Sequence, residues 1–131
     1  MEMPSTSIRD LAQRLLVREA ESRAASDANE AELVCEKLRV SLGRFAGADG
    51  FVALARRSLA LARAEVPSLK AVRVKPDGCV EGLGDPTVAD DGNEAGAALI
   101  TYLLFLLVTF LGESVVFRMV HEAWPEVAME H

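Results

Sequence analysis

The amino-acid sequence predicts a mainly α-helical protein, a bundle of four to five helices with one small β-hairpin near residues 70–83. Apolar residues recur every three or four positions through most of the 131 residues, which is the period of an amphipathic helix. Only 5% of the residues are aromatic, so the core must consist mainly of leucine, valine and alanine, which suit closely packed helices. The length fits one unit, and we expect a single helical domain over residues 1–131.

Three amphipathic helices are expected in the first half of the chain. The first covers residues 8–22 and the second about 28–45, while the third covers about 50–66, with Asp49 as its N-cap and Pro67 just beyond its end. The residues assigned to the polar face of the first helix are Arg9, Arg14, Arg18, Glu19 and Glu21. Because each helix carries an apolar stripe, we expect the three to pack around a common core.

The sequence period changes after residue 70. Residues 71–74 alternate between apolar and polar side chains, and residues 79–81 do so in part, which is typical of a strand. The intervening segment 75–78, with the sequence Lys-Pro-Asp-Gly, favours a type I turn that closes a hairpin with a bulge. An isolated hairpin is marginally stable in water, so this one is expected to pack against the helices.

The C-terminal part begins with a loop over residues 84–93, which are rich in glycine, proline and acids. From Ala95 to Gly112, 18 residues carry no charge. After Gly112 the amphipathic pattern returns, and it ends at Trp124-Pro125. Two arrangements fit this pattern, one long helix or two helices joined at Gly112.

A helix that is apolar on all sides must be covered on all sides. The uncharged run reaches the lower length limit for crossing a bilayer, but its strong block, residues 99–111, is only about 20 Å long as a helix. Its flanks are acidic and lack the basic residues that favour a membrane span. We therefore expect protein to cover it, either the rest of the chain or a second copy. So complete an apolar cylinder in a small domain favours a homodimer.

The side chains expected at this interface or in the core follow from the same run and from the helix after it. They are Leu103, Leu106, Leu107, Phe110 and Phe117, with Trp124 at the margin. A tryptophan at that place is expected to be a packing anchor or an interface residue.

Two polar features of the last helix suggest alternatives. Glu113 directly follows the apolar run, and we expect it to be buried and paired with Arg118 or with an arginine of the first three helices, which would set the helix register. The other interpretation makes Glu113 a polar point in an apolar ligand pocket. Glu113, Phe117 and His121 are spaced four apart and share a helical face. Because nothing completes a catalytic or metal site there, His121 is expected to be a surface or semi-buried residue near a helix end.

No motif indicates enzymatic chemistry. The sequence contains no phosphate-binding glycine loop, and the acids from Asp85 to Glu94 do not match calcium-loop spacing. We therefore expect a protein that is not an enzyme and holds no cofactor or metal. The net charge of −6 disfavours binding to nucleic acid. Two cysteines far apart, Cys35 and Cys79, suggest reduced thiols in a cytoplasmic protein, and a disulfide between them is the alternative.

Together, these observations lead to two hypotheses about function. The first is a non-enzymatic protein-interaction or scaffolding module that self-associates through its apolar C-terminal helices and can also bind another protein. The second is a regulatory domain that binds or senses a small apolar ligand.

Overall fold

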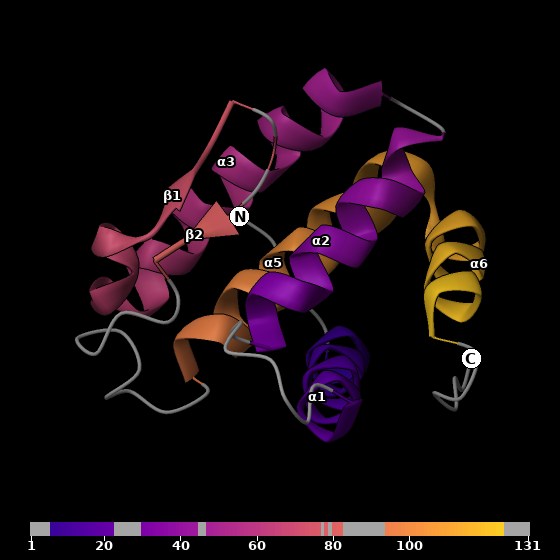
Figure 1. The fold of residues 1–131 in the computed structure, drawn as a ribbon, viewed down its shortest axis with the longest axis horizontal. Helices are drawn as coiled ribbons and strands as arrows, with labels where there is room; N and C mark the ends of the chain where they lie inside the picture. The colour runs from indigo at the N-terminus through magenta and orange to yellow at the C-terminus, as the bar shows by residue number, and fades with distance from the viewer. Residues whose placement is uncertain are drawn as a thin grey trace.

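The computed structural model describes residues 6–22, 30–44, 47–76, 78, 80–82 and 94–124. The elements are α1 (Thr6–Ser22), α2 (Glu30–Gly43), α3 (Gly47–Glu65), the 3-10 helix η1 (Pro67–Ala71), β1 (Arg73–Val74), β2 (Val80–Glu81), α5 (Glu94–Leu111) and α6 (Glu113–Ala123). This order confirms the predicted mainly α-helical bundle with one small β-hairpin. Figure 1 shows the helices gathered around α5.

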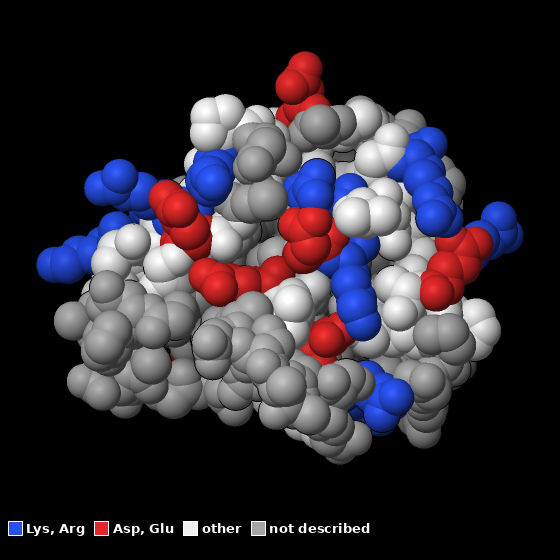
Figure 2. Space-filling view, in the orientation of Figure 1, with Lys and Arg blue, Asp and Glu red and all other residues white. Residues whose placement is uncertain are grey.

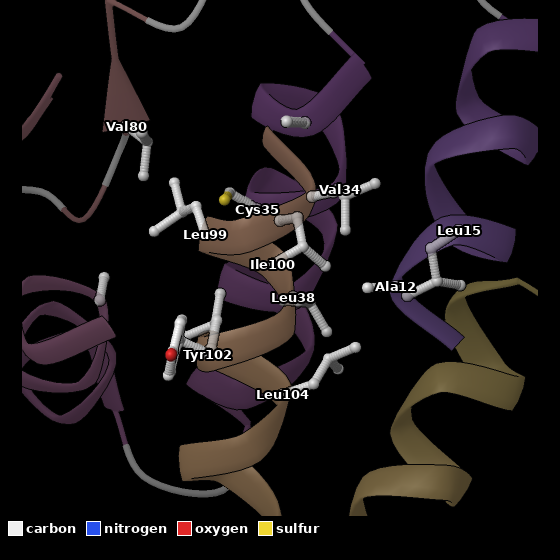
Figure 3. Packing of buried hydrophobic residues seen from close by; sticks show 14 of the residues in the cluster. Ala12, Leu15, Val34, Cys35, Leu38, Val80, Leu99, Ile100, Tyr102 and Leu104 are labelled. Carbon is white, nitrogen blue, oxygen red and sulfur yellow. The ribbon is translucent and has the colours of Figure 1, made fainter. Parts of the chain in front are cut away.

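Helix α5 is the central element of the bundle, and it contacts α1, α2, α3 and α6. Its position follows from its composition, because a helix without a charged residue from Ala95 to Leu111 leaves no face that prefers water. Eleven of its residues are buried, between Ala95 and Leu107. Figure 3 shows Leu99, Ile100 and Leu104 of α5 among side chains from α1, α2 and β2.

Helix limits agree with the sequence-based expectations apart from small shifts. Helix α3 ends at Glu65, before Pro67, as expected from the steric restriction that proline imposes. It begins at Gly47, so Asp49 lies in its first turn and is not the N-cap. There the Asp49 carboxylate still interacts favourably with the helix dipole.

The hairpin pairs β1 with β2 in antiparallel fashion, with Arg73 opposite Glu81 and Val74 opposite Val80. The Gly78 amide donates a hydrogen bond of 2.8 Å to the Lys75 carbonyl, which is the bond that closes a four-residue turn. The buried Val80 side chain faces α5 (Figure 3). The hairpin thus packs against the bundle, as expected.

Close helix packing is visible where α2 crosses α5. A Cβ atom added at Gly96 would lie only 2.8 Å from the Cβ of Ala31. Real Cβ atoms do not approach so closely, so glycine at this position allows the two helices to meet near their N-terminal ends. This contact helps to place the start of α5 inside the bundle.

Residues 94–124 form two helices, which decides between the two arrangements that the sequence left open. Gly112 separates α5 from α6 and has φ 92° and ψ 153°, a backbone conformation that favours glycine. The Gly112 amide still bonds to the Val108 carbonyl at 2.9 Å, and the Val116 amide bonds to the Gly112 carbonyl at 3.2 Å. The chain therefore changes direction at one residue.

Candidate interaction surface

The cover that the bundle provides for α5 ends near its C-terminus. Leu103, Leu106 and Leu107 are all buried within the chain itself. By contrast, Phe110 is 64% exposed, the largest exposed fraction among the large apolar side chains that the structure describes. Most of the apolar cylinder therefore needs no second copy to hide it, and only the last turns of α5 remain open.

We call the uncovered part of α5 the apolar end. It comprises Phe105, Val108, Phe110 and Leu111. Phe105, Val108 and Leu111 are half-buried and pack against the core, whereas Phe110, which does not share a helical face with Phe105, is 64% exposed. The hydroxyl of Thr109, within this segment, donates a hydrogen bond of 2.8 Å to the Phe105 carbonyl. That bond satisfies the hydroxyl donor within the helix, so the apolar end presents mainly hydrocarbon to solvent.

The expected burial of Glu113 with Arg118 is wrong. Both side chains are exposed on α6. Residues five apart are separated by about 140° around an α-helix, so they do not face each other as residues three or four apart do. Because the chain turns at Gly112, Glu113 starts a new helix at the surface and does not extend the buried face of α5. At this position the negative charge of the Glu113 carboxylate interacts favourably with the positive N-terminal end of the α6 dipole.

The face that Glu113 shares with Phe117 and His121 lies on α6, the helix that follows the apolar end in the chain. Phe117 is half-buried against the core, while Glu113 and His121 are exposed. His121 lies in the last turn of α6, a place where a protonated imidazole stabilises the helix dipole. Among the described residues, no group of three or more histidine, cysteine or acidic side chains is arranged to hold a metal ion.

The sequence assignments missed a polar cluster at the other end of α6. Trp124 is fully buried, and its indole Nε1 donates a hydrogen bond of 2.9 Å to Oε1 of Glu19. Glu19, only 3% exposed, also forms an ion pair with Lys37. The Lys37 Nζ lies 5.5 Å from the centre of the Trp124 ring, within the range of a cation–π interaction. This cluster joins α1, α2 and the end of α6.

The assignment of Glu19 to the polar face of the first helix is therefore wrong. Glu19 follows Leu15 and Leu16 by four and three residues, so it continues the buried stripe of α1. Helical spacing was the signal that could have found it. Its charge instead suggested an exposed position, because a carboxylate is buried only where other groups pair with it.

Beside this cluster, α2 and α6 form an open groove of about 290 Å³. Its lining residues are Glu36, Lys37, Val40, Ser41, Arg44, Glu122 and Ala123. Four of these seven carry a charge and the groove is open to solvent, so it differs from the enclosed apolar pocket that the ligand-binding hypothesis requires.

Cys35 is a free thiol buried between α2 and α5 (Figure 3). Burial raises the pKa of Cys35 to about 12, and the nearby Glu32 and Glu36 carboxylates add to the effect. Such a thiol is protonated and inert at neutral pH. Cys79, the partner in the alternative disulfide, lies outside the described residues.

By length and composition, α5 is the one described helix that could cross a membrane. However, 67% of its apolar window is buried inside the protein, as in the core helix of a soluble protein, so this observation is weak support for a membrane span.

On the face shown in Figure 2, basic and acidic side chains are interspersed, and neither sign forms a continuous patch.

Ion pairs also join the helices at the surface. Arg9 of α1 and Glu65 of α3 approach to 3.0 Å, and a second guanidinium nitrogen lies 3.5 Å from the same carboxylate. Hydrogen bonding to Glu65 raises the pKa of Arg9 above its ordinary value, and Tyr102 contributes in the same direction. Since both partners are about one third exposed, the pair adds at most about 1 kcal/mol.

Comparison with known proteins gave no match to any family model, curated protein or solved structure.

Proposed function

We propose that this protein is a non-enzymatic interaction module that self-associates through the apolar end of α5. The observation that carries the proposal is the 64% exposure of Phe110 at the C-terminal end of α5, directly before the half-buried Leu111. A large aromatic side chain exposed on a rigid helix is the type of residue that anchors protein interfaces. A second copy is the partner because an isologous contact needs only one such surface.

The size of the surface sets the expected affinity. An aromatic side chain buries about 150–250 Å², so the apolar end supplies only part of the roughly 800 Å² per partner of a standard interface. A small interface with one aromatic anchor is expected to be weak, with a dissociation constant on the order of micromolar. The module would therefore be a monomer when dilute and a dimer when concentrated.

The test compares two substitutions that place the same charge at different exposed apolar sites. Phe110→Asp puts a carboxylate at the centre of the proposed interface, whereas Val17→Asp does so on α1, where Val17 is 54% exposed. Light scattering coupled to size-exclusion chromatography, over a concentration series, measures the mass. We expect the parent protein and the Val17→Asp variant to dimerise, and the Phe110→Asp variant to stay monomeric.

Far-ultraviolet circular dichroism and thermal melting show whether both variants remain folded. A parent protein that is monomeric up to about 1 mM would refute self-association, since a biologically useful interface is stronger than that. Equal dimerisation of the Phe110→Asp variant would place the interface elsewhere.

We also propose a cytoplasmic location, where cysteines such as Cys35 remain reduced. The alternative function, binding of a small apolar ligand, has no supporting observation in the groove beside α6, because the groove is open to solvent and four of its seven lining residues carry a charge. Native mass spectrometry of the purified protein would reveal such a ligand as a bound mass that is lost on denaturation.

A further inference from the structure

We infer that α6 is an exchangeable arm, and that two copies of this chain can swap it by straightening the backbone at Gly112. The inference rests on the proposed self-association for its partner, a second copy, but it uses a different set of contacts. In the exchanged dimer, α6 of each copy would occupy the site on the other copy that it occupies on its own bundle in the monomer.

The first observation is that the connection between α5 and α6 is a single residue. Gly112 has a positive φ of 92°, and a Cβ added there would meet nothing within 4 Å. No side chain packs at the place of the missing Cβ, and glycine permits the positive φ of the bend. Short connections between helices are the places where exchange between copies occurs most readily.

The second observation concerns the backbone hydrogen bonds on either side of the bend. The bonds from Gly112 to Val108 and from Val116 to Gly112 already have the helical spacing of four residues. Straightening the chain would add the three bonds between them, from the amides of residues 113–115 to the carbonyls of residues 109–111. A continuous helix over residues 94–123 thus satisfies backbone groups that two separate helix ends leave to solvent.

The third observation is that α6 cannot leave its site without replacement. Its inner face buries Val116, Met119 and Val120 against the core, and the buried Trp124 follows it. Trp124 also provides the indole hydrogen bond to Glu19. A straightened chain would expose all of these groups, and only an identical α6 can restore both the apolar contacts and that hydrogen bond. The fitting occupant is therefore the α6 of a second copy.

The geometry of exchange also brings the two apolar ends together. In the exchanged dimer, the α6 helix of the first copy occupies the α6 site of the second copy, so its residue 113 lies next to the C-terminal end of the second copy's α5. Residue 113 of the first copy is also joined through residue 112 to the C-terminal end of its own α5. The last turns of the two α5 helices must therefore adjoin. Phe110 and its neighbours in the two copies would then cover one another.

The hinge is tested by Gly112→Ala, with Gly43→Ala as the matched control. Alanine disfavours the positive φ of the bend and favours a continuous helix, so the substitution shifts the balance toward the straight form by roughly tenfold or more per chain, or about a hundredfold per dimer. Gly43 ends α2 without a positive φ, and a Cβ there meets nothing within 4 Å. We expect stable dimers of the first variant only.

Cross-linking distinguishes exchange from simple contact between surfaces. Val40 of α2 and Ala123 of α6 line the same groove. One Gly112→Ala chain carries Val40→Cys and the other carries Ala123→Cys, both with Cys79→Ser, and the two are unfolded and refolded together. A short bismaleimide can then join position 40 of one chain to position 123 of the other only if α6 has been exchanged, in about half of the dimers for random mixing.

An intermolecular 40–123 cross-link supports the inference. Its absence from dimers, while the doubly substituted single chain cross-links within itself, refutes exchange and leaves self-association through the apolar end intact. If Gly112→Ala does not fold, the same mixture with Gly112 retained is refolded at high protein concentration, and its dimer fraction is cross-linked. Failure to detect the intermolecular product there also refutes exchange, whereas a parent protein that never dimerises counts against the proposed function.

Discussion

Trp124 and Glu19 should stabilise the fold through one shared interaction, although they are 105 residues apart in sequence. Trp124→Phe removes the indole donor and leaves the buried Glu19 carboxylate with one partner fewer. A hydrogen bond to a charged group is worth about 1.5–3 kcal/mol, and the lost ring adds a packing term. Glu19→Met keeps the side-chain length but leaves the indole N–H without its acceptor, at about 1–3 kcal/mol.

In the double variant, neither polar group is left alone, so its destabilisation should be smaller than the sum of the two single effects. We expect a coupling energy of about 1–2 kcal/mol. Lys37 contributes little to it, because its side chain is 44% exposed and can be hydrated when Glu19 is replaced.

Urea unfolding followed by far-ultraviolet circular dichroism measures the four free energies. Tryptophan fluorescence is unsuitable because Trp124 is the single tryptophan of the chain. The matched control is Glu81→Met, which makes the same substitution at an exposed site on β2 and should add independently to Trp124→Phe. A coupling below about 0.5 kcal/mol between Glu19 and Trp124 would show that the hydrogen bond does not hold the end of α6 to the bundle.

Three further substitutions probe the core and its helix contacts. Leu107 is fully buried, so Leu107→Ala should lower the free energy of unfolding by about 2–5 kcal/mol in urea titrations. Leu107→Asp should prevent folding. Unchanged melting of either variant would contradict the central place of α5. Gly96→Ala should destabilise by about 1 kcal/mol or more, because its Cβ would press on Ala31, and a gain in melting temperature would show that the helices separate easily. The free energy of unfolding should fall above pH 9, because the pKa of the Cys35 thiol is near 9 in the unfolded chain but about 12 in the folded protein. The loss is about 1 kcal/mol at pH 10. Urea titrations at pH 8 and pH 10 should show this loss in the parent protein and lack it in the Cys35→Ala variant.

The bundle and its hairpin could be predicted because their signals are local. A stretch of 18 residues without charge had to become the most enclosed helix, and that stretch is the central α5. The change of period after residue 70 and the Lys-Pro-Asp-Gly segment placed the hairpin. Proline at positions 67 and 125 marked where helices stop, since proline restricts the residue that precedes it.

The candidate surface was harder to predict. Phe110 and Leu107 are equally apolar neighbours in sequence, yet one is 64% exposed and the other is fully buried. The difference arises because the neighbouring helices cover α5 at Leu107 but not one turn later at Phe110. A sequence pattern shows that glycine can bend at position 112 but not whether it does.

The amino-acid sequence by itself determined which segments are helical and which helix needs the most cover, because hydrophobic periodicity and the absence of charge act over neighbouring residues. Only the tertiary structure decided that Glu19 is buried, that Glu113 and Arg118 are not, and that the cover over α5 stops before Phe110. These outcomes depend on contacts between segments up to 105 residues apart. The free energy of burying a charge or a phenyl ring is set by the partners that the fold brings to it.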